Sequence, residues 1–206
     1  MESFQVYKYM KARTNLEIYI GVVGPVRTGK STFIKRFMDL LVLPNMTDIH
    51  AKERTQDELP QSASGTTIMT TEPKFVPKEA AGVKLSDDLE VKIRMIDCVG
   101  FMAEGASGHI DKDEERQVKT PWFEYEIPFT KAAAIGTQKV IRDHATIGIV
   151  VTTDGSVTDL PRENYIQAEE RTVKELKAIG KPFMILLNCK KPVSYTHLRA
   201  HETAAN

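Results

Sequence analysis

A segment near the N-terminus has the residue types and spacing of a phosphate-binding loop. A glycine at position 24 is followed by four residues and then by Gly29, Lys30 and Ser31. Glycines let the backbone wrap a polyphosphate with its N–H groups directed inward. Lys30 can reach the β- and γ-phosphate oxygens, and the Ser31 hydroxyl can ligate Mg²⁺. The residues predicted to contact a nucleoside triphosphate here are Gly24, Arg27, Thr28, Gly29, Lys30, Ser31 and Thr32.

A carboxylate is predicted to join this site from the end of a later strand. Asp97 and Gly100 follow the apolar run 89–96. An acid at the carboxyl end of a strand beside a phosphate loop can hold Mg²⁺ directly or through water. The Gly100 N–H can approach the γ-phosphate. Asp-x-x-Gly is a weak pattern alone, but its place after a phosphate loop predicts a catalytic and metal-binding role for Asp97.

A threonine-rich segment between these two motifs offers a further hydroxyl ligand. Switch-type phosphate-loop enzymes need a mobile hydroxyl that completes Mg²⁺ coordination and senses the γ-phosphate. Thr66, Thr67, Thr70 and Thr71 are candidates, and Thr70 and Thr71 lie closest to a strand that begins near Lys74. We expect Thr70 and Thr71 to be catalytic and Thr70 to reach the metal. The alternative is a threonine-rich turn or edge strand.

The residues after Gly100 depart from the pattern of small GTPases. There a glutamine often follows the Asp-x-x-Gly and orients the attacking water. Here the next residues are Phe101 and Met102. Another group must position the water, so we expect slow turnover.

The segment 188–191 predicts which base is bound. Guanine-specific relatives carry Asn/Thr-Lys-x-Asp here, and the aspartate accepts two hydrogen bonds that adenine cannot supply. This chain has Asn188-Cys189-Lys190-Lys191 without a following aspartate. The loss of that selective contact argues against strict GTP specificity. We expect Asn188 and Lys190 to contact the nucleotide and ATP to be preferred.

The elements that must position these groups alternate along the chain. Apolar runs at 16–23, 89–96, 146–153 and 183–188 predict buried strands. Helical spacing follows the phosphate loop and recurs at 48–59, 129–144 and 161–179. This alternation predicts an α/β fold, a mostly parallel sheet with helices on both faces and the nucleotide at the carboxyl ends of the strands.

Residues 101–127 are predicted to form a long loop, the place where a nucleotide-responsive switch would lie. A solvated acidic loop is favoured over a metal site at His109, Asp111 and Asp113. The aromatic residues 122, 123 and 125 are expected to pack the loop against the domain, with a partner surface as the alternative.

Composition excludes several classes of protein. Lysine plus arginine equals aspartate plus glutamate at 28 each, so no net charge favours nucleic acid. Cys98 and Cys189 suit a reducing compartment as small apolar residues. No apolar run approaches the roughly 20 residues of a transmembrane helix, and no signal peptide is visible. We expect a cytoplasmic protein.

The last residues do not continue the α/β pattern. We expect residues 1–192 to form a phosphate-loop ATPase domain that is truncated, and residues 193–206 to be a non-native tail. His197 and His201 are therefore not treated as metal ligands.

Taken together, the motifs resemble the N-terminal ATPase domain of the stage IV sporulation protein A family. The resemblance covers residues 1–192 and is carried by the segments 24–32, 64–75, 96–101, 152–156 and 186–192. It implies a GTPase-like, TRAFAC-type fold that hydrolyses ATP with Mg²⁺. Lys30 would bind phosphate, Asp97 would be the Mg²⁺-associated acid, and Thr70 and Thr71 would be the sensor threonines.

The same resemblance implies a cellular role. Hydrolysis would drive self-assembly, as a homopolymer, of the spore-coat basement layer in the mother-cell cytoplasm at the outer forespore surface. The expected partners are other spore-coat proteins and a small amphipathic membrane-docking peptide. Two alternatives stay open: a regulatory GTPase of the ribosome-assembly type, and a scaffold that binds nucleotide without turnover.

Overall fold

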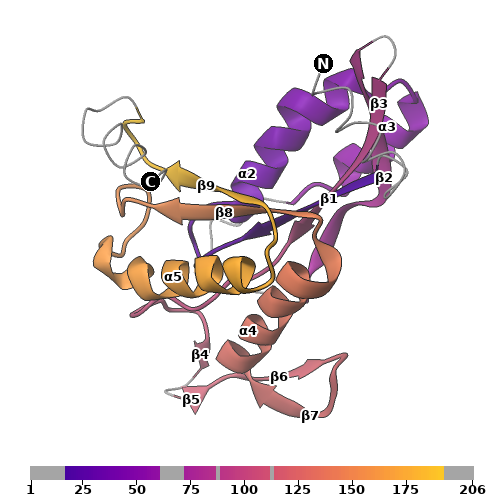
Figure 1. The fold of residues 1–206 in the computed structure, drawn as a ribbon. Coiled ribbons are helices and arrows are strands. Elements are labelled where there is room, and N and C mark those ends of the chain that lie inside the picture. The colour runs from indigo at the N-terminus through magenta and orange to yellow at the C-terminus, as the bar shows by residue number, and fades with distance from the viewer. Residues whose placement is uncertain (1–16, 61–71, 87–88, 112–113, 193–206) are drawn as a thin grey trace.

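The computed structural model describes residues 17–60, 72–86, 89–111 and 114–192 (Figure 1). Its centre is a five-stranded sheet in the order β2-β3-β1-β8-β9. The central strand β1 (Glu17–Val23) is parallel to β3 (Leu89–Asp97) and to β8 (Ile147–Thr153), and β9 (Phe183–Asn188) is parallel to β8. Only the edge strand β2 (Lys74–Ser86) runs antiparallel to its neighbour. The predicted mostly parallel sheet is confirmed.

Helices cover both faces of this sheet, as predicted (Figure 1). The helix α2 (Lys30–Phe37) continues into a π-helical turn, η1 (Met38–Val42), and a 3₁₀ turn, η2 (Leu43–Asn45), on one face. On the other face lie α4 (Phe129–Lys139), its π-helical continuation η3 (Val140–His144) and α5 (Glu163–Ala178).

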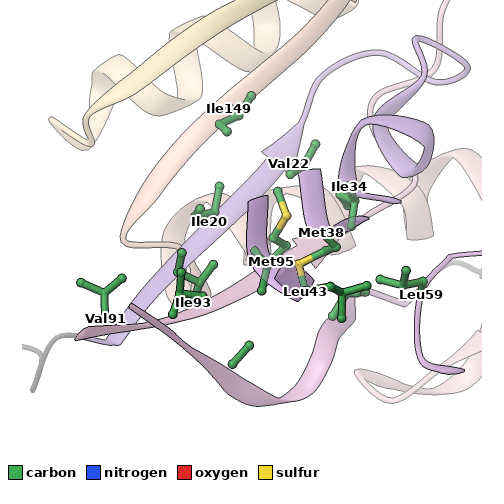
Figure 2. Packing of buried hydrophobic residues seen from close by; sticks show 14 of the residues in the cluster. Ile20, Val22, Ile34, Met38, Leu43, Leu59, Val91, Ile93, Met95 and Ile149 are labelled. Atoms are coloured by element: carbon green, nitrogen blue, oxygen red, sulfur yellow. The ribbon is translucent and has the colours of Figure 1, made fainter. Parts of the chain in front are cut away.

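The strands supply the two faces with alternating apolar residues. Figure 2 shows the cluster under α2, to which β1, β3 and β8 contribute Ile20, Val22, Ile93, Met95, Ile149 and Val151. The residues between them point the other way, and Val23, Ile96 and Val150 pack with α4, η3 and α5. Both faces of the central strands are buried, which accounts for the near-continuous apolar runs in the sequence.

The predicted helix at 48–59 is α3 (Ile49–Asp57). Asp48 caps it, because its carboxylate accepts hydrogen bonds from the backbone N–H groups of His50 (2.9 Å) and Ala51 (3.1 Å). The helices predicted at 129–144 and 161–179 are also present, and α5 begins two residues after Pro161.

The prediction of one long loop at 101–127 was wrong. Four short strands lie in or at the end of this segment: β4 (Ile110–Asp111), β5 (Glu114–Glu115), β6 (Gln117–Thr120) and β7 (Phe123–Pro128). The hairpin β6–β7 projects from the sheet beside α4 (Figure 1). Ile127 is buried and Val118 is half-buried, an alternation too short to separate from loop composition in the sequence.

The aromatic residues of the hairpin contact lysines of α4. Lys139 Nζ lies 5.6 Å from the Trp122 ring centroid, and Lys131 Nζ lies 5.8 Å from that of Phe123. Tyr125 is 62% exposed, and its ring centroid lies 5.4 Å from that of Phe123. Packing against the domain therefore holds for the first two aromatics, while Tyr125 faces solvent.

Candidate functional site

The phosphate loop joins the end of β1 to the start of α2. Gly24 has φ +128° and Gly29 has φ +93°, both in the left-handed range that favours glycine. A Cβ on Gly24 would lie 2.3 Å from the Val151 carbonyl oxygen. The first α2 hydrogen bond runs from Phe33 N to Gly29 O at 2.8 Å. The glycines thus let the loop pass close to β8 and turn directly into the helix.

Lys30 brings a cation into the interior of this loop. The residue is 5% exposed, and its Nζ donates to the carbonyl oxygens of Pro25 (2.5 Å) and Gly24 (3.5 Å). Burial lowers the Lys30 pKa, and the electrostatic interactions with Cys98 and Asp97 oppose that shift. Among the described residues, the hydrogen-bond acceptors of this buried ammonium are neutral carbonyls, which suits it to an incoming anion.

Ser31 and Asp97 meet beside Lys30, although they are far apart in the sequence. Ser31 Oγ donates to Asp97 Oδ2 at 2.6 Å, which brings the first turn of α2 against the end of β3. Burial raises the Asp97 pKa, while the Ser31 hydrogen bond and the Lys30 charge act to lower it. The Asp97 Oδ1 atom is shielded from solvent without a hydrogen-bond partner among the described residues.

This donor set fits Mg²⁺. A serine hydroxyl and a carboxylate oxygen are hard oxygen ligands, and the cation usually takes one or two protein ligands together with phosphate oxygens. The unpartnered Oδ1 of Asp97 is a buried acceptor that a cation would satisfy. Ser31 and Asp97 are therefore the described residues that would hold the metal.

Gly100 and Phe101 fasten the end of β3 to the phosphate loop. Gly100 has φ +97°, and a Cβ there would lie 2.1 Å from the Gly24 carbonyl oxygen. Phe101 forms a bridge with Pro25, and its carbonyl accepts from Val26 N at 2.9 Å. The Phe101 side chain is 2% exposed in the cluster beneath α4 and α5, with the Arg171 guanidinium 4.2 Å from its ring centroid. It packs in the core and offers no polar group for water.

The last residue of β9, Asn188, contacts the phosphate loop. Asn188 Nδ2 donates to the Thr28 carbonyl at 3.0 Å. Thr28 is fully buried, and its hydroxyl donates to Pro25 O at 3.0 Å. Lys190 is exposed at the rim.

The remaining predicted residues are spread around this centre. Arg27 is half-buried and has φ +60°, and Thr32 is exposed on the first turn of α2. Thr70 and Thr71 lie outside the described residues, as do Thr66 and Thr67, so their roles stay predictions. The tail 193–206 also lies outside them.

Two residues at this site, Cys98 and Ser156, were not identified as site residues from the sequence. Cys98 lies beside Lys30, and its Sγ donates to Val22 O at 3.5 Å. Ser156 contacts the segment after β9, because its Oγ accepts from Lys190 N at 3.0 Å. The sequence Asp154-Gly155-Ser156 after β8 could have indicated Ser156, because aspartate, glycine and serine are typical turn residues and their side chains hydrogen-bond to nearby groups.

Comparisons with known proteins identify relatives of this chain. The family model described as "Stage IV sporulation protein A, ATPase domain" matches residues 1–205. Stage IV sporulation protein A of Bacillus subtilis (strain 168) is 56% identical over 192 residues, which are 93% of this chain and 39% of that protein. The protein of that name from Clostridioides difficile (strain 630) is 55% identical over 189 residues, which are 92% of this chain and 38% of that protein. The chain thus spans about two fifths of the length of these relatives.

Two solved structures of SsGBP variants have TM-scores of 0.43 and 0.44 at 16% identity. They cover 98% of this chain, which spans 49% and 50% of theirs. Among the described residues, no helix has the length and apolar character needed to cross a membrane.

Proposed function

The chain belongs to the ATPase-domain family of stage IV sporulation protein A, and on this basis we propose that it binds ATP with Mg²⁺ and hydrolyses it slowly. The observation that carries the proposal is the contact of Ser31 with Asp97 beside the buried Lys30. An anion-binding loop, a buried cation and a pair of oxygen ligands converge there from two separate elements.

Each residue has a separate task in this proposal. The backbone N–H groups of the phosphate loop and the N-terminus of α2 bind and orient the polyphosphate. Lys30 neutralises charge on the β- and γ-phosphates, and Ser31 and Asp97 hold the metal. Mg²⁺, when bound, supplies neutralisation of the charge that develops on the transferred phosphoryl group. Gly100 brings its backbone close to the phosphate loop, where it can sense the γ-phosphate.

Slow turnover follows from the core position of Phe101. A small GTPase has a water-orienting glutamine near this point, whereas the Phe101 ring packs beneath Arg171. Thr70 and Thr71 are proposed to complete the metal site and to sense the γ-phosphate. ATP is proposed over GTP because no aspartate follows Lys190 to accept from guanine.

In the cell, hydrolysis is proposed to drive self-assembly of the spore-coat basement layer at the outer forespore surface in the mother cell. The relatives are named as sporulation proteins, which supports this setting. The proposed partners are further copies of the protein, other coat proteins and a small amphipathic membrane-docking peptide. Because the chain spans only part of its relatives, these interactions are proposed for the full-length protein.

Phosphate release from ATP and from GTP, measured with Mg²⁺, tests the proposal. We expect ATP to be hydrolysed in preference to GTP, and Lys30→Ala, Asp97→Ala and the double variant Thr70→Ala/Thr71→Ala to abolish release. Lys35→Ala is the matched control, since it removes a lysine from the same helix outside the phosphate loop.

The outcomes separate the three candidate functions. ATP release that the Lys30 variant loses and the Lys35 variant keeps supports an ATPase. Preference for GTP would move the regulatory GTPase to the front. Binding without release above the Lys30→Ala background would favour the scaffold without turnover, the candidate that the buried Phe101 ring supports.

A further inference from the structure

A turn at the end of β8 holds the segment that follows β9. Asp154 Oδ1 accepts from the backbone N–H of Ser156 at 2.9 Å and from its hydroxyl at 2.6 Å. The Ser156 Oγ in turn accepts from Lys190 N at 3.0 Å. The three groups form a chain of hydrogen bonds from one loop to the next.

The chemistry of the serine hydroxyl determines which group donates and which accepts in these hydrogen bonds. A serine hydroxyl has one proton, and the 2.6 Å contact with the Asp154 carboxylate uses it. Its oxygen is then an acceptor toward the Lys190 N–H. An alanine at 156 would remove both functions at once.

The turn itself is built to hold this serine in place. Gly155 has φ +87°, and a Cβ there would lie 2.9 Å from the Arg162 backbone nitrogen. The Gly155 N–H donates to Thr153 Oγ1 at 3.1 Å. Ser156 is half-buried, so its hydrogen bonds are partly protected from competing water.

The segment 188–190 is therefore fastened at both ends. Asn188 Nδ2 donates to Thr28 O in the phosphate loop, and a Cβ on Gly29 would lie 2.5 Å from that same nitrogen. Two residues later, Lys190 is held by Ser156. Asn188 and Lys190 are the residues that the sequence predicts to contact the nucleotide at its base, and the contact of Asn188 with Thr28 holds them beside the phosphate loop at the carboxyl ends of the strands.

We propose that Ser156 is a positioning residue for base recognition, which acts by holding residues 188–190 against the adenine of a bound ATP while Asp154 orients its hydroxyl. The inference rests on the proposed ATP binding and deepens it. Ser156 does not contact the phosphates in this scheme, so its removal should weaken recognition of the base and leave recognition of the phosphates unchanged.

The experiment compares ATP with inorganic tripolyphosphate, each with Mg²⁺, by calorimetric titration of the full 206-residue chain. Tripolyphosphate carries the phosphates without a base. We expect Ser156→Ala to weaken ATP binding about tenfold, the scale of one lost charge-assisted hydrogen bond, and to change tripolyphosphate binding less than about twofold. Ser156→Thr, which keeps the hydroxyl, should restore most of the affinity for ATP.

Thr158→Val is the matched control. The Thr158 hydroxyl donates within its own loop, to Leu160 O at 3.1 Å and Gly155 O at 3.4 Å, so both affinities should stay close to those of the natural chain. If Ser156→Ala weakens both ligands equally or neither, the inference is overturned and the proposed function stands. If the natural chain binds ATP no more tightly than tripolyphosphate, base recognition fails and the inference with it. Absence of ATP binding by the natural chain would overturn the proposed function as well.

Discussion

The ionisable side chains of Lys30 and Asp97 are buried close to each other, and burial disfavours the charged form of each. It lowers the pKa of Lys30 and raises that of Asp97. Both shifts have the same cause, since removal from water penalises the charged form. Such a pair is poorly suited to stabilising the fold and well suited to binding a charged ligand that carries a metal ion. Burial of these two side chains therefore reduces stability and favours ligand binding.

Gly24 is predicted to tolerate no side chain. In Gly24→Ala the new Cβ would lie 2.3 Å from the Val151 backbone, at a left-handed φ of +128°. We expect loss of nucleotide binding and destabilisation well beyond the roughly 1 kcal/mol cost of a left-handed alanine. Gly180→Ala is the matched control, because its φ is also positive but nothing lies within 4 Å of the added Cβ. Urea unfolding measures both, and equal losses would contradict the role of the close approach.

The two cysteines are predicted to differ in reactivity. Burial raises the pKa of the Cys98 thiol to about 11, so almost no thiolate forms there at neutral pH. Cys189 is half-buried at the rim of the site. We expect iodoacetamide at pH 7.5 to label Cys189 first in the folded chain and both in denaturant, as peptide mapping by mass spectrometry would detect. Equal labelling of the folded protein would count against the burial of Cys98.

At the scale of elements, the segment after β3 is held to the body of the molecule through the start of α4. The Glu115 carboxylate accepts from Thr130 N at 2.9 Å and from Thr130 Oγ1 at 2.6 Å. Phe129 N donates to Arg116 O at 2.9 Å, and the Arg116 guanidinium lies 5.2 Å from the Phe129 ring centroid. A carboxylate at the first turn of a helix also meets the positive end of its dipole. These contacts help to hold part of the segment 101–127, which the sequence predicts to be a loop.

Glu115→Ala should therefore lower the free energy of unfolding by about 1 kcal/mol at pH 7, the usual cost of a lost helix cap. The Thr130 hydrogen bonds hold the Glu115 pKa below its ordinary value of 4.5. A lowered pKa means that the carboxylate stabilises the fold above pH 4.5 and that this contribution is lost as the pH falls through the folded value. The difference between the variant and the natural chain should shrink accordingly in denaturant titrations at decreasing pH.

Glu114→Ala is the neighbouring control, since Glu114 is exposed in the same strand. It should change stability by less than about 0.5 kcal/mol. A constant effect of Glu115→Ala across this pH range would show that packing, and not the carboxylate, holds α4.

At the scale of the whole molecule, the parallel strands deliver loops from distant parts of the chain to one edge of the sheet. The phosphate loop follows β1, Asp97 ends β3, and the residues that follow β8 and end β9 lie on the far side. A ligand that contacts all of these loops stabilises the folded state as a unit, because the unfolded chain has no such site.

We therefore expect ATP with Mg²⁺ to raise the free energy of unfolding by about 2.7 kcal/mol at a ligand concentration one hundred times the Kd. Chelation of Mg²⁺ with EDTA should reduce this stabilisation, because it removes the cation that Ser31 and Asp97 are proposed to hold. Thermal unfolding over a series of ATP concentrations is the measurement. Lys30→Ala should show almost no shift, and a shift equal to that of the natural chain would place the ligand elsewhere.

Features that depend on neighbouring residues could be predicted from the sequence alone. The phosphate loop is readable because its chemistry needs particular residue types at fixed spacing over nine positions. The buried strands and amphipathic helices can be predicted because apolar residues recur at different spacings in the two kinds of element. From their alternation the mostly parallel sheet, with helices on both faces, also follows.

The contacts between residues that are distant in the sequence are known only from the fold. The contacts of Ser31 with Asp97 and of Asn188 with Thr28 join residues 66 and 160 positions apart. The strand predicted to begin near Lys74 is present as β2, but its antiparallel pairing with β3, the hairpin β6–β7 and the link from Ser156 to Lys190 could not be predicted from the sequence. The physical reason is that pairing and packing depend on the surface that a partner element presents, whereas local patterns record only the preferences of one segment.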